Sequence, residues 1–159
     1  MRIVLFAITG LLLSCQQTNS SLTTLVKAHF EAANRHDVDA LRLSYDDSVK
    51  GESPNWGKIV TGPDSIAHQY ERMFVSTPDL KYELKSIALG PNHATAEYIL
   101  SGTLTNLEKE VPEFMRGKAY SFPVCTIFEF KDEKIIREGS YFDQVAFLRQ
   151  VGYFEQGTK

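Results

Sequence analysis

The chain has 159 residues, which is enough for one ordinary domain and too few for two. Apolar residues make up 43% and charged residues 23%, a composition that argues against a disordered chain. The net charge of −3, with no basic block, argues against a nucleic-acid binder. Two cysteines are too few for a disulfide framework or a cysteine-based zinc site.

Residues 1–14 have the layout of a secretory signal. Arg2 precedes an apolar run that is much shorter than the roughly 20 residues of a bilayer span. The following Leu-Leu-Ser-Cys, which ends at Cys15, resembles a bacterial lipobox. That resemblance implies that Cys15 is lipidated and that residues 15–21 form a polar tether. The alternative is a plain N-terminal helix that ends at a chance cysteine.

A lipidated Cys15 predicts a lipid-anchored protein of the bacterial cell envelope, with the membrane as a partner. Gln16 is not the aspartate that retains many lipoproteins at the inner membrane of Gram-negative species. The outer membrane is therefore the favoured location in such a species.

Three helices are predicted next along the chain. Apolar residues recur at helical spacing between residues 22 and 33 and predict a helix over about 20–35. Asp37 is placed to cap a second, short helix. Gly62-Pro63 opens a third helix, because proline suits a first helical turn.

The apolar period changes to two from Leu80 onward, which indicates strands. Strands are predicted from residue 80, over 93–105, over 118–130 and over 134–142. A last short helix follows Asp143 and ends at Gly152. Strands grouped after helices predict an α+β fold, with helices on one face of an antiparallel sheet.

Four stretches in this order resemble the SnoaL-like branch of the nuclear transport factor 2-like superfamily. The first is Phe30–Leu41, and the second is Gly62–Tyr70 followed by Pro78–Leu80. The third is Gly117-Lys118 entering a strand that ends in Phe128–Ile136, and the fourth is Tyr141–Asp143 leading to Leu148–Gly152. The resemblance implies a domain over 22–152, followed by a tail over 153–159. It also implies a cone, in which a strongly curved antiparallel sheet and three to four helices surround an apolar pocket, and a homodimer formed through the sheet.

The resemblance points to Asp143 as the catalytic acid or base, because cyclases of this branch use an aspartate just before the final helix. An apolar cavity would raise its pKa toward neutrality, as proton transfer needs. Tyr141 and Arg137 share its strand parity and are the candidate assistants. Each of two residues also has a purely structural interpretation. Asp143 could cap the last helix, and Arg137 could be a solvated surface group.

The sequence departs from two reactions of the family. Cyclases pair the aspartate with a histidine on the preceding strand, but the last histidine here is His93. An epoxide hydrolase would need a second aspartate beside Arg137 and Asp143, and none is evident on a neighbouring strand. Neither reaction is therefore favoured by the sequence.

The expected ligand is a small, largely apolar molecule, and the chemistry is proton transfer with no cofactor. No metal site is expected, since no histidine pair has ligand spacing. His29 is read as a core residue. A non-catalytic ligand-binding or dimerisation module is the alternative, and a peptide-binding domain is a third. The residues expected to line the pocket are Trp56, Tyr70, Phe74, Tyr98, Leu100 and Phe128.

Overall fold

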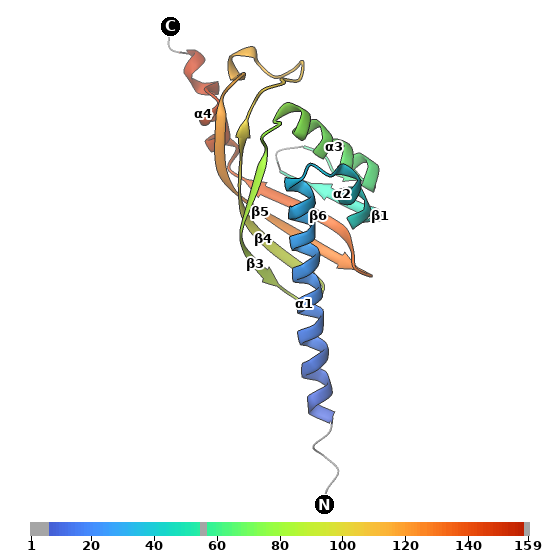
Figure 1. The fold of residues 1–159 in the computed structure, drawn as a ribbon. Coiled ribbons are helices and arrows are strands. Elements are labelled where there is room, and N and C mark those ends of the chain that lie inside the picture. Colours follow the sequence, from blue (N-terminus) through green and yellow to red (C-terminus); the bar gives the residue numbers. More distant parts are fainter. Residues whose placement is uncertain (1–6, 55–56, 158–159) are drawn as a thin grey trace, which may run out of the picture.

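One strongly curved sheet carries the fold (Figure 1). The computed structural model describes residues 7–54 and 57–157, with side chains for 21–54 and 57–155. Within these residues the strands are β1 Tyr45–Glu52, β2 Val60–Thr61, β3 Lys81–Leu89, β4 His93–Thr103, β5 Ala119–Lys131 and β6 Lys134–Phe142. The α-helices are α1 Ala7–Asn34, α2 Val38–Ser44, α3 Pro63–Ser76 and α4 Gln144–Gln150, with 3-10 helices η1 Glu113–Met115 and η2 Tyr153–Gly157.

The six strands lie in the order β2-β1-β6-β5-β4-β3. Neighbouring strands are antiparallel except for β1 and β6, which run parallel. These two strands are far apart in the chain, so no hairpin sets their relative direction. The predicted α+β cone is confirmed, and its sheet is mixed rather than purely antiparallel.

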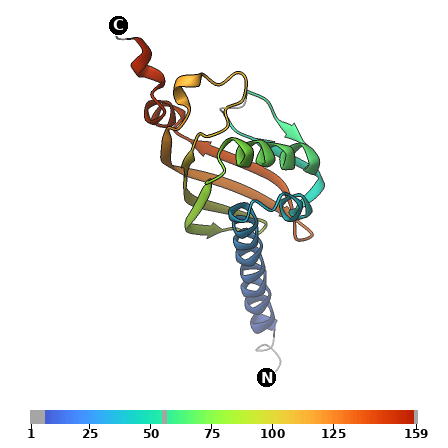
Figure 2. The same ribbon diagram turned by 45° about the horizontal axis from the view of Figure 1, so that its top comes forward.

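Helices α1, α2 and α3 lie on one side of the sheet (Figure 2). The apolar stripe of α1 faces the sheet, and Leu22, Val26, Phe30 and Ala33 are buried as the spacing predicts. Asp37 caps α2 by accepting a hydrogen bond from the amide of Ala40 at 3.0 Å. These three helices form the wall opposite the sheet.

Helix α1 begins at Ala7 and passes through residues 16–21, where the sequence analysis expects a tether. Its N-terminal part extends away from the sheet (Figure 1). Residues 1–6 and the side chain of Cys15 lie outside the described part of the chain, so the signal peptide and the lipid anchor stay predictions. None of the described helices combines the length and the apolar character of a membrane span.

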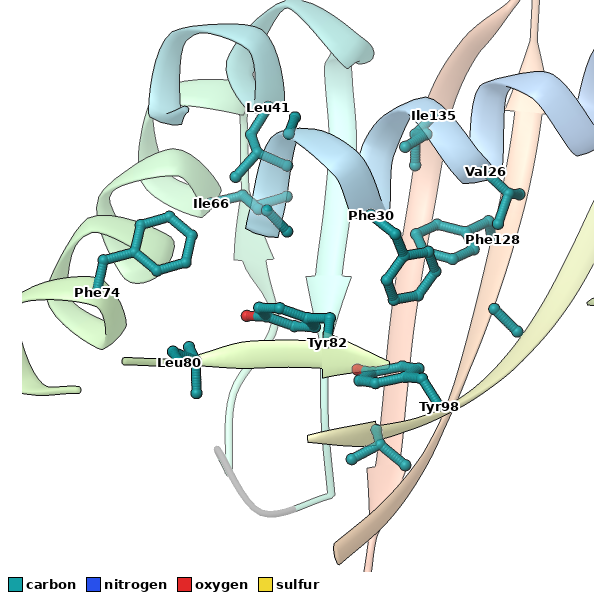
Figure 3. Close-up of a cluster of buried hydrophobic side chains, with 14 of the residues drawn as sticks. Val26, Phe30, Leu41, Ile66, Phe74, Leu80, Tyr82, Tyr98, Phe128 and Ile135 are labelled. Carbon is teal, nitrogen blue, oxygen red and sulfur yellow. The ribbon is translucent and has the colours of Figure 1, made fainter. Parts of the chain in front are cut away.

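The core lies between the helices and the concave face of the sheet. Alternate residues of β4 and β5 point inward, as the sequence period predicts. Figure 3 shows Phe30 of α1 among Tyr82, Tyr98 and Phe128 of the sheet. The rings of Phe30 and Tyr98 pack edge to face with centroids 4.9 Å apart. Each large apolar side chain buried here stabilises the fold by about 1.5–3 kcal/mol.

Candidate functional site

A cavity of about 150 Å³ lies between α3 and the concave face of the sheet. Its wall is almost entirely apolar or aromatic. Helix α3 supplies one side and strands β3 to β6 supply the other. The lining residues are Ile66, Gln69, Tyr70, Met73, Tyr82, Tyr98, Leu100, Val124, Glu138, Ser140 and Phe142.

One carboxylate, that of Glu138, belongs to this wall. Its residue is only 7% exposed. The hydroxyl of Tyr70 donates to Glu138 Oε1 at 2.8 Å, and the hydroxyl of Tyr45 donates to Oε2. Both carboxylate oxygens are therefore held by tyrosine hydroxyls that donate to them.

A bulge in β6 turns Glu138 into the cavity. Glu129 of β5 pairs with Arg137, but the next residue, Phe130, pairs with Ile135, so Ile136 is an extra residue. Alternation from the buried Ile135 would otherwise place Arg137 inward. The extra residue reverses the faces, and Glu138 points inward instead.

His29 of α1 extends the hydrogen-bonded group. Its Nε2 lies 3.2 Å from the Tyr70 hydroxyl oxygen. Because that hydroxyl donates to Glu138, Nε2 carries the hydrogen and Nδ1 is the free acceptor. Burial lowers the pKa of His29, and the opposing attraction of Glu138 is the smaller effect. His29 is therefore a neutral donor at pH 7.

Buried Thr126 links the hydroxyls of two cavity-lining residues, Tyr98 and Ser140. Thr126 lies 3.1 Å from the Tyr98 hydroxyl and 2.9 Å from the Ser140 hydroxyl. The hydroxyl of Tyr82 is buried and has no hydrogen-bond partner within the described residues. Figure 3 shows the hydroxyls of Tyr82 and Tyr98 pointing toward the α3 side of the core.

The cavity tyrosines, and the buried Tyr45 beside them, stay protonated under ordinary conditions. Burial raises the pKa of Tyr45, Tyr70 and Tyr82 well above the usual value, and the charge of Glu138 adds to the effect. Burial also raises the pKa of Tyr98. These side chains therefore act as neutral hydrogen-bonding groups.

The structure brings three of the six predicted pocket residues to the cavity, namely Tyr70, Tyr98 and Leu100. Phe74 and Phe128 are buried in the core and do not line the cavity. Trp56 lies outside the described residues. His29 is a core residue, as expected, but it also contacts the cavity tyrosine Tyr70.

The three predicted catalytic residues lie outside the cavity. Arg137 pairs with Glu52 and with Glu129 on the other face of the sheet, and its Nη2 lies 3.4 Å from the Tyr141 hydroxyl. Exposed Asp143 caps α4 by accepting from the amide of Ala146 at 3.0 Å. The acid of the cavity is thus Glu138, because the bulge at Ile136 puts Arg137 and Tyr141 on the outer face.

The sequence analysis also missed Tyr45, Tyr82, Thr126 and Ser140. A glutamate between Ile135-Ile136 and Gly139 is an unusual residue for a buried strand and is the one local signal that points to the site. Within the described residues, no group of three or more His, Cys, Asp or Glu side chains is placed to hold a metal ion.

Comparisons with known proteins place this geometry in context. The family model of the SnoaL-like domain matches residues 26–138. A predicted polyketide cyclase from Xanthomonas campestris is 26% identical, with a TM-score of 0.71, and the match covers 83% of this chain and 97% of that chain. No significantly similar protein is found among the curated proteins.

Two further solved structures share the fold. One is a hypothetical protein with a ketosteroid isomerase-like fold from Catenulispora acidiphila, in complex with trimethylamine; it is 19% identical, with a TM-score of 0.68 over 80% of this chain and 92% of that chain. The other is an LEH-like epoxide hydrolase from M. tuberculosis, 18% identical, with a TM-score of 0.68 over 85% of this chain and 91% of that chain. At this identity the likeness shows the fold alone.

Proposed function

This chain belongs to the SnoaL-like domain family, and from that premise we propose that its cavity binds a small apolar molecule whose polar end meets Glu138. The observation that carries the proposal is a buried carboxylate, held by Tyr45 and Tyr70, in the wall of an otherwise apolar cavity. Apolar walls supply affinity, and a few placed polar groups supply orientation.

The cavity volume limits the ligand. A closed apolar cavity of about 150 Å³ takes a molecule of the size of benzene, whereas drug-sized ligands need about 300–1,000 Å³. The volume found here therefore favours a ligand of about six to eight non-hydrogen atoms.

Glu138 is also placed to move a proton. A carboxylate that lines an apolar cavity can take a proton from a bound molecule and return it, without a cofactor. Tyr45 and Tyr70 hold its two oxygens in place, and the hydroxyl of Tyr82, which has no partner in the described part of the chain, is available to the polar atom of the ligand. The alternative is a binding module in which Glu138 only recognises the ligand.

One experiment tests binding and turnover together. Small apolar compounds are screened against the protein by ligand-observed NMR in D₂O. For compounds that bind, the loss of ligand C–H signal to deuterium is followed with the wild type and with Glu138→Gln. Exchange that requires Glu138 supports proton transfer, binding without exchange supports the binding module, and the absence of any binder rejects the proposal.

The lipid anchor and a homodimer formed through the sheet are further parts of the proposal. The lipobox-like residues that end at Cys15 support the anchor. The test is membrane fractionation of the full chain and of Cys15→Ser in a bacterial host. Retention of Cys15→Ser in the membrane fraction would reject the anchor, and sedimentation equilibrium of the soluble domain tests the dimer.

A further inference from the structure

Glu138 is a buried carboxyl group with no cationic partner among the described side chains. None of the ion pairs in the described part of the chain involves Glu138. Among the described residues, the hydrogen bonds to its carboxylate come from the hydroxyls of Tyr45 and Tyr70. Buried charges in folded proteins are normally paired, because an isolated charge in an apolar medium is strongly unfavourable.

Neighbouring groups do not supply the missing positive charge. His29 is the basic side chain nearest in the hydrogen-bonded group, and burial keeps it neutral. Arg137, which directly precedes Glu138 in β6, points to the opposite face of the sheet and pairs with Glu52 and Glu129. No lysine or arginine belongs to the described cavity wall.

The remaining wall suits a cation. The rings of Tyr70, Tyr82, Tyr98 and Phe142 line the cavity, and aromatic faces attract organic cations. Tyr82 is only 5% exposed, and its hydroxyl is buried and has no hydrogen-bond partner within the described residues. Its oxygen is therefore free to accept a hydrogen bond from a ligand N–H.

We infer that the ligand of this cavity is a small apolar amine, bound as its ammonium ion, with the nitrogen at Glu138 and the carbon skeleton against the aromatic wall. This inference rests on the proposed function, because it names the chemical class of the molecule held in the same cavity. The ammonium ion would supply the positive charge that none of the described side chains brings to Glu138.

The test compares three probes that share one ring and differ in charge. Cyclohexylamine is protonated at pH 7, since alkyl amines such as lysine have a pKa of about 10.4. Cyclohexanol is its neutral counterpart, and cyclohexanecarboxylate is the anion. Dissociation constants of all three are measured on the wild type by calorimetry or NMR titration. This comparison needs no variant and so does not depend on the folding of one.

The expected result is that cyclohexylamine binds about tenfold or more tightly than cyclohexanol, and that the carboxylate binds most weakly. Glu138→Gln is expected to abolish the preference for the amine. The matched control is Glu97→Gln, which neutralises an exposed glutamate of β4 and is expected to keep the preference. Circular dichroism checks that both variants are folded.

Equal or tighter binding of cyclohexanol to the wild type overturns the amine inference and leaves the proposed binding function intact. A preference for the amine that survives in folded Glu138→Gln also overturns it. Failure of all three probes to bind overturns the amine inference and the proposed binding function together. Failure of the amine inference alone is recognised because cyclohexanol still binds.

Discussion

The hydroxyl of Tyr70 lies 2.8 Å from Oε1 of Glu138, a residue 68 positions further along the chain. This bond joins α3 to β6 across the cavity. Tyr45 joins β1 to the same carboxylate, and His29 joins α1 to Tyr70. Four elements of the fold thus meet at one buried charge.

Removal of the Tyr70 hydroxyl is expected to destabilise the protein. Tyr70→Phe should lower the free energy of unfolding by about 2 kcal/mol, because a buried charged acceptor and the His29 donor each lose a partner. Urea unfolding measures the loss. The control is Tyr141→Phe on the outer face of the sheet, which should change stability by no more than about 0.5 kcal/mol. Equal losses in the two variants would contradict this account of Tyr70.

Asp143 is expected to behave as a helix cap. Asn caps a helix nearly as well as Asp, so Asp143→Asn should leave the free energy of unfolding within about 0.5 kcal/mol of the wild type. Asp143→Ala should lower it by about 1 kcal/mol. Neither change should alter ligand binding. A loss of binding in the stable Asn variant would contradict the capping role and would support a role for Asp143 in the cavity.

The buried neutral His29 predicts loss of stability in weak acid. Its pKa is lowered in the folded state, so the unfolded chain binds more protons once the pH falls below about 6.5. The free energy of unfolding should therefore fall as the pH falls through this value toward the lower folded-state pKa. Replacement by glutamine, in His29→Gln, should flatten the profile between pH 7 and pH 5. His68→Gln, at an exposed site of α3, is the control that should keep the wild-type slope.

The buried tyrosines predict the opposite dependence in alkali. Their pKa values are raised in the folded state, so above pH 10 the folded protein keeps protons that the unfolded chain releases. Stability should fall as the pH rises beyond that value. In a titration followed by tyrosinate absorbance, the buried tyrosines should ionise only when the protein unfolds. Tyr82→Phe should reduce this part of the signal, and an unchanged titration would contradict the burial of its hydroxyl.

Much of the fold follows from local patterns. The cap at Asp37, the alternation of β4 and β5, and the bounds of β6 at residues 134–142 are readable from neighbouring residues alone. Short β2 is missed because two residues carry no period. The parallel pairing of β1 with β6 is missed because it joins distant segments.

The site was harder to predict than the fold. Parity correctly grouped Arg137 with Tyr141 on one face, but it does not say which face is inward. The extra residue Ile136 decides that, and its position depends on pairing with β5. The partners Tyr45 and Glu138 are 93 residues apart, so no local motif contains them. Three-dimensional packing decides which of the predicted aromatic residues line the cavity and which lie in the core, so the sequence pattern does not separate them.

The bulge at Ile136 has a consequence for selectivity. Arg137 and Glu138 are adjacent and oppositely charged, and one inserted backbone residue determines which of them faces the ligand. The same side chains on a regularly paired strand would present a guanidinium to the cavity and would favour anions. In this strand the position of the bulge, and not the side chains alone, determines which charged group faces the cavity. Chains are best compared by the position of the bulge before their charged residues are matched.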